Sequence, residues 1–260
     1  MTATAPNPAT LTHPRTVLIT GSTSGIGAAT ARTLASQGWQ VVVTGRDAGR
    51  GARVVTDIES DGGHAVFVPS DLTAAPDALR AFAAAAIEAA GGQVDAVVHN
   101  AALCPAVDTL TLTDDDLAAT LAVNITAPHV LTAALAPAMV DRGHGAVVVI
   151  GSWMAHVGHA FVGLYSATKA AEIQLARSWA AEFGPRGVRV NTVSPGATRT
   201  PINAADGDII AAMTAGTPAG RPGTPQEIAD AVAWLLSDAS AYVHGAELAV
   251  DGGITATRSA

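Results

Sequence analysis

Tyr165 and Lys169 have the residue types and the spacing needed for proton transfer, four positions apart in a segment expected to be helical. Residues at i and i+4 share one helix face, so the ammonium would lie beside the phenol. A positive neighbour favours phenolate and lowers a tyrosine pKa from about 10 toward the working pH of an acid/base catalyst. Lys169 is the only lysine of the chain, in which the other basic residues are all arginine. The pair therefore predicts a proton-transfer site.

Two polar residues could complete this site. Ser152 follows the Val/Ile run Ala146–Ile150, where its hydroxyl could bind a reacting carbonyl oxygen. The alternative interpretation is an ordinary turn serine at a strand end. Asn124 lies in the apolar segment Leu121–Ile125, and a buried amide needs hydrogen-bond partners. It either stabilises a helix kink or organises a water that leads to Lys169.

A glycine-rich turn follows the expected first strand and opens a helix. Glycines let the backbone turn tightly and approach a pyrophosphate, whose charge is met by amide groups at the helix N-terminus. The spacing is G-x-x-x-G-x-G. We expect cofactor contacts from the turn residues Gly21, Ser22, Thr23, Ser24, Gly25, Ile26 and Gly27.

Further cofactor contacts are expected where other strands end, because open α/β sheets bind ligands at the carboxyl ends of their strands. Arg46 follows the second strand, where a carboxylate would select NAD. An arginine there can pair with a 2′-phosphate, which favours NADP(H), although it could also be a solvated surface residue. NAD(H) remains the alternative cofactor. The contacts expected after the third and fourth strands are Asp71 and Leu72, with Asp71 on the adenine, and Asn100, Ala101 and Ala102.

The elements that position these residues alternate between short Val/Ile-rich strands and Ala/Leu-rich helices. Continuous apolar runs are typical of parallel strands covered on both faces. We expect an α/β fold: a single-domain, Rossmann-type, doubly wound, parallel seven-stranded sheet with helices on both faces, spanning residues 15–260. Strands are expected at Thr16–Thr20, Gln40–Thr44, Ala65–Val68, Ala96–His99, Ala146–Ile150, Arg189–Val193 and Glu247–Val250. Helices are expected at Ile26–Gln37, Ala48–Ser60, Ala75–Ala90, Asp114–Met139, Leu164–Phe183 and Pro225–Ser237.

Two segments fall outside this alternation. Residues 1–14 are Thr/Ala/Pro-rich without the basic start and apolar stretch of a signal peptide, and are expected to be a flexible leader. Residues 194–224 are Gly/Pro/Thr-rich and carry no clear element. Loops of that length in a compact domain are usually functional, so this segment is the expected substrate lid.

Composition narrows the partners. A net charge of −8 without basic clusters argues against nucleic acid. The single cysteine, Cys104, suits a reducing compartment, so a cytoplasmic location is expected. The uncharged stretches Leu117–Val140 and Gly143–Thr168 contain proline, glycine, asparagine or histidine, which makes a buried interior or a subunit interface a better interpretation than a membrane span. The triplet Asp114–Asp116 is expected to complement a helix dipole, and we expect no metal site.

Taken together, these motifs resemble the short-chain dehydrogenase/reductase family over about residues 14–253. The match comprises the glycine turn, Asp71, Asn100-Ala101-Ala102, the four residues Asn124, Ser152, Tyr165 and Lys169, and Asp251-Gly252-Gly253, in the family's order. The resemblance implies a catalytic tetrad: Tyr165 as general acid, Lys169 on the nicotinamide ribose, Ser152 on the carbonyl and Asn124 in the proton relay. It also implies nicotinamide contacts from Pro195, Gly196, Thr198 and Thr200, and a homotetramer. His99 stands where the family commonly has asparagine.

The expected substrate is an apolar or amphipathic ketone or alcohol. The segment after the fifth strand and the lid supply the pocket residues Ser152, Trp153, Met154, His159 and Ile202. The favoured hypothesis is an NADP(H)-dependent ketoreductase or secondary-alcohol dehydrogenase, resembling the 3-oxoacyl-acyl-carrier-protein reductases of the family. One alternative is an NAD-dependent alcohol, polyol or steroid dehydrogenase. The other, of a different class, is a non-catalytic dinucleotide sensor.

Overall fold

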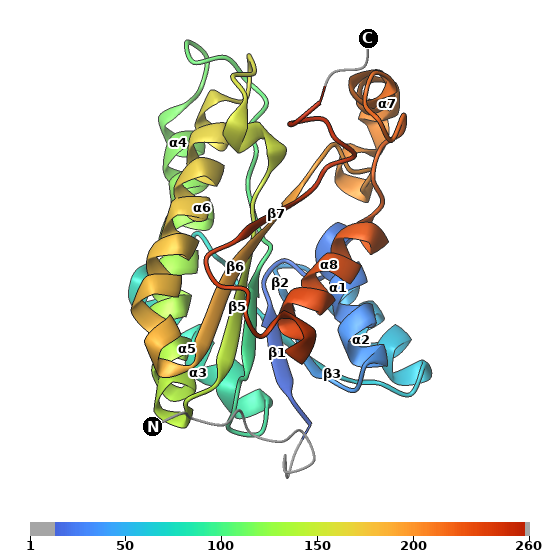
Figure 1. Ribbon diagram of the computed structural model, residues 1–260. Coiled ribbons are helices and arrows are strands. Elements are labelled where there is room, and N and C mark those ends of the chain that lie inside the picture. The colour runs from blue at the N-terminus through green and yellow to red at the C-terminus, as the bar shows by residue number, and fades with distance from the viewer. Residues whose placement is uncertain (1–13, 258–260) are drawn as a thin grey trace.

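A seven-stranded parallel sheet forms the centre of the molecule, in the order β3-β2-β1-β4-β5-β6-β7 (Figure 1). The computed structural model describes residues 14–257, and of residues 202 and 205–208 the backbone only. The expected leader, apart from Pro14, lies outside the described residues. The doubly wound α/β fold is confirmed. The strands are β1 Thr16–Ile19, β2 Gln40–Gly45, β3 His64–Pro69, β4 Ala96–His99, β5 Gly145–Ile150, β6 Val188–Pro195 and β7 Glu247–Val250.

Successive residues of each strand point alternately into two separate hydrophobic cores, one on each face of the sheet. Leu18 of β1 points into the first core, whereas its neighbours Val17 and Ile19 point into the second. All three side chains are fully buried. Burial on both faces explains why these strands read as continuous apolar runs and not as alternating ones.

Two helical layers cover the cores, as Figure 1 shows: α1, α2 and α8 on one side, and α3, α4, α5 and α6 on the other. Their bounds are α1 Gly25–Ser36, α2 Ala48–Ser60, α3 Pro76–Ala89, α4 Asp114–Leu121, α5 Ala127–Arg142, α6 Gly163–Phe183 and α8 Pro225–Leu236. Good N-terminal caps start several of them. Thr224 and Glu227 form a reciprocal capping box at α8, and Thr113 caps α4.

The helix expected over Asp114–Met139 differs in detail. A π-helical turn, η2 (Ala122–Thr126), separates α4 from α5, which continues to Arg142. Pro128 stands at the start of α5, lacks an amide hydrogen, and would press its ring against the carbonyl four residues earlier in a regular helix. A wider π turn relieves both problems, and such turns are frequent at functional sites.

One helical run, Asp114–Arg142, has the length and mean hydropathy of a membrane span. Its apolar side chains have partners within the fold. Val130, Leu131, Leu135 and Met139 are buried in the same core as residues of α3, β4 and β5. Packing against the sheet therefore accounts for the apolar character of this run.

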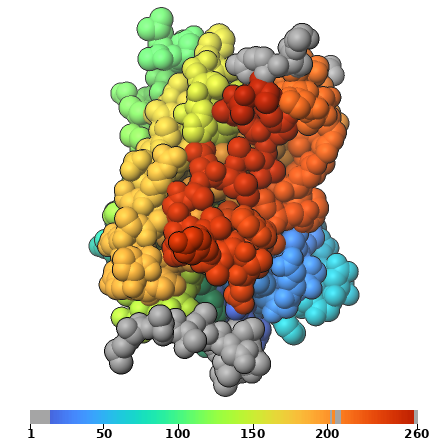
Figure 2. Space-filling view, in the orientation of Figure 1, coloured from blue at the N-terminus to red at the C-terminus, as the bar shows by residue number. Residues whose placement is uncertain are grey.

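The expected lid contains more structure than its sequence indicates. After β6 come a 3-10 segment, η5 (Pro201–Asp206), and the helix α7 (Gly207–Ala215). Because α7 is short and apolar on every side in sequence, it lacks the periodic pattern that marks an amphipathic helix. In Figure 1, α7 rises at one end of the molecule, and in Figure 2 the C-terminal residues, in red, pack between α6 and the lid.

Candidate active site

Tyr165 and Lys169 lie together near the start of α6, as the spacing predicts. The Lys169 Nζ is 5.7 Å from the centre of the Tyr165 ring. The same atom donates a hydrogen bond of 2.7 Å to the carbonyl oxygen of Ile150, the last residue of β5. Lys169 is 1% exposed. The helix and the central sheet therefore hold a buried ammonium beside the phenol.

The electrostatics of Tyr165 differ from the expectation. Burial raises its pKa and outweighs the Lys169 charge and the Ser152 hydrogen bond, both of which lower it. The net direction is upward from its ordinary value. The expected lowering was wrong because it counted the neighbouring charge and left out the loss of hydration.

Ser152 and Asn124 approach the pair from two other elements. Ser152 is buried two residues beyond the end of β5, and its Oγ accepts a 3.2 Å hydrogen bond from the amide of Met154. Asn124 is fully buried in the π turn. Its Oδ1 accepts from the amide of Leu103, and its Nδ2 donates to the Leu103 carbonyl and to Thr168 Oγ1. Asn124 thus ties the π turn both to the loop after β4 and to α6, next to Lys169.

The backbone of the glycine turn and the start of α1 leave amide groups available to an anion. Gly21 and Gly25 have positive φ angles of 65° and 53°. Ser24 precedes α1 without capping it through its side chain, and no acidic residue occupies the first turn. The amides of residues 25–27 have no acceptor within the helix, because the first helical bond runs from Ala28 to Ser24. Free amide groups at a positive helix end suit a pyrophosphate.

The side chain of Asn100 hydrogen-bonds the backbone of this turn. Its Nδ2 donates to the carbonyls of Thr20 and Gly21. A Cβ on Gly27 would lie only 2.5 Å from that nitrogen, so only glycine fits there. Ala101 packs against Gly21, and the exposed Ala102 follows it. A dinucleotide at this turn would therefore depend on the path of the backbone, which the absence of side chains at the glycines permits.

Three expected cofactor residues use their side chains structurally. Ser22 Oγ donates to the Ile19 carbonyl and accepts from the amide of Thr44, which braces β1 against β2. Leu72 is buried in the core. Thr23 packs against Gly45, where a Cβ would lie 2.7 Å from Thr23 Cγ2. Ser22 and Leu72 can offer a cofactor only their backbone groups.

Arg46 and Asp71, the charged residues expected to contact the adenosine, lie beyond the ends of β2 and β3. Arg46 is exposed beyond β2 and, within residues 14–257, forms no ion pair. The adjacent Asp47 caps α2 and pairs with Arg50 at 2.9 Å. Asp71 accepts hydrogen bonds from the amide and hydroxyl of Thr73, which with the nearby Arg46 charge lower its pKa.

The segment after β6 returns across the glycine turn. Thr200 abuts Gly25, with its Cβ 3.5 Å from where a glycine Cβ would stand. Thr198 is buried, and its carbonyl accepts a hydrogen bond from Asn203. Pro195 ends β6, and Gly196 lies so close to Asp251 that a Cβ there would be 2.6 Å from its Cα.

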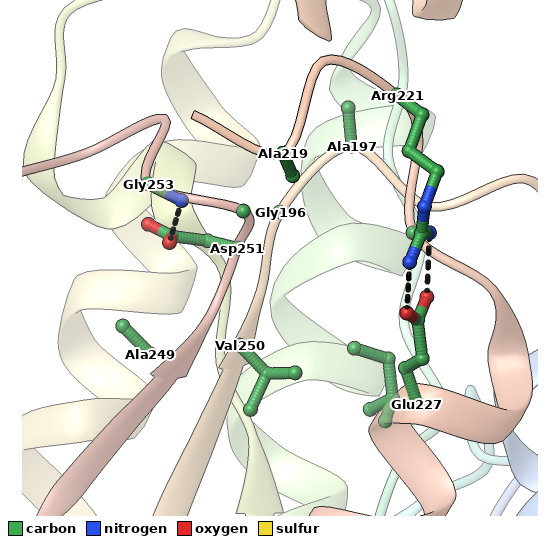
Figure 3. Close-up of a pocket in the computed structure, with 12 residues that line it drawn as sticks. Gly196, Ala197, Ala219, Arg221, Glu227, Ala249, Val250, Asp251 and Gly253 are labelled. Atoms are coloured by element: carbon green, nitrogen blue, oxygen red, sulfur yellow. Dashed lines mark hydrogen bonds and ion pairs between the residues drawn. The ribbon is translucent and has the colours of Figure 1, made fainter. Parts of the chain in front are cut away.

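A hollow of about 290 Å³ lies beside this segment, between the ends of β6 and β7 and the returning lid (Figure 3). The pair Arg221–Glu227 closes one side of it, and the amide of Ala219 binds the Gly252 carbonyl. These contacts anchor the second half of the lid to the sheet and to α8.

Known proteins of one family match this chain over nearly its whole length. A family model described as enoyl-(acyl carrier protein) reductase, which belongs to the short-chain dehydrogenases/reductases, matches residues 21–255. The chain is 38% identical over 245 residues to an L-rhamnose 1-dehydrogenase (NAD(P)(+)) of Sphingomonas sp. (strain SKA58), covering 92% of this chain and 96% of that one. The chain belongs to the short-chain dehydrogenase/reductase family.

Two further relatives support the assignment. A cis-4-hydroxycyclohexanecarboxylate dehydrogenase of Sinomonas cyclohexanicum is 39% identical over 246 residues, covering 93% of this chain and 97% of that one. A solved structure described as a short chain dehydrogenase/reductase family protein superposes with a TM-score of 0.86 at 43% identity, over 94% of this chain and 99% of that chain. The protein is an NAD(P)-dependent oxidoreductase of CH–OH and C=O groups.

Two of the expected substrate residues lie in a short helix that contacts α6. Trp153 and Met154 are half-buried in the short helix η3 (Trp153–His156) that Ser152 caps. His159 is exposed, and its Nδ1 lies 2.6 Å from the Ala160 carbonyl. Ile202 falls in η5, but its side chain is outside the described part of the chain. Phe161, half-exposed between η3 and α6, has a positive φ of 68°.

Three residues with a place at this short-chain dehydrogenase site escaped the sequence interpretation. Thr168 links Asn124 to α6. Glu172 is 2% exposed, and its Oε2 lies 2.7 Å from Lys169 Nζ. Glu247 Oε1 accepts a hydrogen bond of 2.6 Å from Ser194 Oγ and lies 2.5 Å from His156 Nε2. These two contacts fix the end of η3 to β6 and β7. The available signal for Glu172 was an acidic residue three positions after the sole lysine.

No group of three or more potential metal ligands occurs among residues 14–257. The acidic triplet of α4 occupies the first turn of that helix, with Thr113 as its cap.

Proposed function

We propose that this chain is an NADP(H)-preferring ketoreductase or secondary-alcohol dehydrogenase. The observation that carries the proposal is the convergence of Tyr165, Lys169, Ser152 and Asn124 from α6, the end of β5 and the π turn. A half-buried phenol, a buried ammonium and a buried hydroxyl at one point are the groups that a carbonyl needs in order to become an alcohol.

Each residue has a defined task in this proposal. A bound nicotinamide supplies or accepts the hydride. Ser152 donates a hydrogen bond to the substrate oxygen and orients it. Tyr165 gives that oxygen its proton during reduction and takes it back during oxidation. Lys169 stabilises the charge that forms on Tyr165, and Asn124 keeps the π turn and Thr168 in place beside it.

Cofactor preference rests on the end of β2. Arg46 is exposed and forms no ion pair among the described residues, so its guanidinium can pair with a 2′-phosphate. Asp47, the carboxylate nearest to it in sequence, is engaged as the cap of α2 and with Arg50, so it is poorly placed to bind a ribose hydroxyl. Both observations favour NADP(H) over NAD(H). One relative is named for use of either cofactor, so NAD(H) is the alternative.

The substrate is proposed to be a small ketone or secondary alcohol of apolar or amphipathic character, bound by Trp153, Met154, His159 and Ile202. Relatives named for a sugar and for a hydroxycyclohexane acid favour a ring-sized substrate. A carrier-bound acyl chain is less well supported. Arg142, Arg177 and Arg186, which could meet an acidic carrier, are engaged with Asp95, with Glu247 and with the Phe183 ring respectively.

The test is oxidation of NADPH and of NADH with a panel of aryl and cyclic ketones, run beside Tyr165→Phe. NADPH-preferring turnover that the variant loses by about 10²-fold or more supports the proposal. Arg46→Ala is expected to lower kcat/KM for NADPH by about tenfold with little change for NADH. Arg80→Ala, an exposed ion-paired arginine on α3, serves as the control.

Other outcomes separate the alternatives. Preference for NADH would move the chain to the NAD-dependent alcohol, polyol or steroid dehydrogenases while leaving the chemistry intact. Tight NADPH binding without turnover of any ketone or alcohol would favour the sensor. Full activity of Tyr165→Phe would overturn the proposed mechanism.

A further inference from the structure

Glu172 is a buried carboxylate at the catalytic site that the family tetrad does not include. It lies three residues after Lys169 on α6, and the side chains of Lys169 and Glu172 are 2% and 1% exposed. Their charged atoms are 2.7 Å apart. Within residues 14–257, Glu172 Oε2 has no hydrogen-bond partner, so its contact with Lys169 is an ion pair. The ammonium of Lys169 is therefore the charge partner of this carboxylate.

Burying a carboxylate destabilises the folded protein, so the burial of Glu172 beside Lys169 needs an explanation. Removing an ion from water costs several kcal/mol even after the protein relaxes, and a neutral apolar side chain of similar size would avoid that cost. Neighbouring inward-facing positions of α6, Ile173 and Ala176, are apolar. The chain thus places one charge among apolar neighbours, next to its only lysine.

We propose that Glu172 is a positioning residue of the catalytic site, which holds the Lys169 ammonium in place and keeps the Tyr165–Lys169 pair in its proton-donating form. The geometry divides the three N–H groups of the ammonium. One donates to the Ile150 carbonyl at 2.7 Å, and the ammonium forms its ion pair with the Glu172 carboxylate at 2.7 Å on another side, which leaves the remaining side for Tyr165 and the cofactor.

Charge acts on both members of the pair in the same direction. A carboxylate beside an ammonium stabilises the charged lysine, and a carboxylate near a phenol opposes phenolate formation. Burial lowers the pKa of Lys169, but the charges of Glu172, first, and of Tyr165 and Cys104 together outweigh it, and the net direction is upward. Burial raises the pKa of Tyr165, and Glu172 adds to that rise. The pair should hold its protons to higher pH than it would without Glu172.

Other groups facing the pair come from three elements. The Cys104 thiol, in the loop after β4, acts on both residues once it ionises, and burial raises its own pKa. Ser152, beyond β5, hydrogen-bonds Tyr165. His99 of β4 faces Lys169, and burial lowers the His99 pKa to about 3, so it is neutral at working pH. Glu172 is thus the carboxylate that balances Lys169.

The inference rests on the proposed function, in which Tyr165 is the proton donor to a ketone. Its consequence is a bias toward reduction, because the phenol form persists into alkaline solution. Oxidation needs a proton acceptor and would begin only at higher pH. The inference assigns this bias to Glu172 in particular.

The composition of the chain permits a direct test. Lys169 is the only lysine, so lysine labelled in its side chain gives one NMR resonance whose titration reports this ammonium. The chain has two tyrosines, and Tyr242 is fully exposed. In a Tyr242→Phe background the phenolate absorbance therefore reports Tyr165 alone. Neither measurement needs a substrate, so the inference and the proposed function can fail separately.

With Glu172→Gln, the first deprotonation of the Tyr165–Lys169 pair is expected at a pH lower by about one unit or more, a tenfold change in proton affinity. The alkaline limb of kcat for ketone reduction should move by the same amount. Glu172→Asp, which keeps the charge, should restore part of the shift. Glu182→Gln removes an exposed carboxylate from the same helix and should change neither titration.

A lower melting temperature of Glu172→Gln with unchanged titrations and an unchanged pH limb would show that Glu172 only fills space, and would overturn the inference. If that variant does not fold, the wild-type protein decides. A Lys169 resonance that titrates below the ordinary lysine value of about 10.4 would contradict the carboxylate's role, and one that titrates above it would support that role.

Discussion

At the scale of single residues, His99 shows how far burial can change a side chain's chemistry. It is 2% exposed on β4, with Nε2 2.8 Å from Thr132 Oγ1, and Nδ1 has no hydrogen-bond partner within residues 14–257. Burial first, and then the Lys169 charge, lower its pKa from 6.5 to about 3. The folded protein therefore holds His99 neutral, whereas the unfolded chain protonates it below about 6.5.

The sign of the linkage follows from that difference. Above pH 6.5 both states are neutral at His99 and the free energy of unfolding is unaffected. As the pH falls from 6.5 toward 3, only the unfolded chain binds the proton, so stability falls by about 1.4 kcal/mol per pH unit. His99→Asn, the residue common in the family at this position, should remove that component of acid sensitivity.

Urea denaturation between pH 7 and pH 4.5 would measure the effect, with His64→Asn as the control because His64 is exposed on β3. The His99 variant should lose less stability over this range than the wild type. Equal slopes for the wild type and His99→Asn would show that His99 is protonated in the folded state.

At the scale of elements, the first turns of α1 and α2 each contain a glycine, and the two glycines have different amounts of space around them. A Cβ on Gly27 would meet Asn100 Nδ2 and the Gly21 carbonyl at 2.5 Å. A Cβ on Gly49, in the first turn of α2, would have no neighbour closer than 3.4 Å. Both are helical positions, so they form a matched pair.

Gly27→Ala should displace Asn100 or the turn and weaken binding of NADPH and NADH alike, by tenfold or more, because both share the pyrophosphate. Gly49→Ala should leave binding unchanged and stabilise the fold by about 0.5–1 kcal/mol, since alanine is the better helix former. Calorimetric titration of both cofactors and thermal melting measure these effects. Unchanged affinity in Gly27→Ala would show that the turn is not the pyrophosphate site.

Elements differ in how far a sequence predicts them. Runs such as Val41–Val43 and the glycines of the turn are local signals, so all seven strands and the turn before α1 were predictable. The π turn was not, since it depends on Pro128 and a buried Asn124 acting within one apolar run. Glu172 was missed because α6 carries few charges on any side, which leaves its sheet-facing side unmarked. The Tyr165 pKa needed burial, which spacing alone does not contain.

At the scale of the whole molecule, the outer face of α5 and α6 is short of charge. α5 exposes His129, Ala133 and Pro137, and α6 exposes Ala167, Ala170, Ala171, Gln174 and Ser178, while the exposed charges Asp141, Arg177 and Glu182 lie toward the C-terminal ends of the two helices. A hollow of about 320 Å³ lies between the two helices, lined by apolar side chains such as Val140, Trp179 and Phe183 and, at its rim, by Asp141, Glu182 and Arg186. Small uncharged side chains beside such a hollow suit close helix packing against a second copy. We propose that this face is a contact between copies of the chain in the homotetramer that the family resemblance implies.

Ala133→Arg places a long cationic side chain at the centre of that face and should break the assembly, because an unpaired charge in a desolvated contact costs several kcal/mol. Light scattering during gel filtration should give the wild type a multiple of the 25.9 kDa chain and the variant a smaller mass. Ala84→Arg, at an exposed alanine of α3 in the same helical layer, should keep the wild-type mass. Because α6 carries Tyr165, Lys169 and Glu172, and the π turn with Asn124 leads directly into α5, loss of assembly should also lower kcat and leave the cofactor Kd, set by β1 and α1, nearly unchanged. A wild-type monomer, or an Ala133→Arg protein of wild-type mass, would remove this face from the assembly.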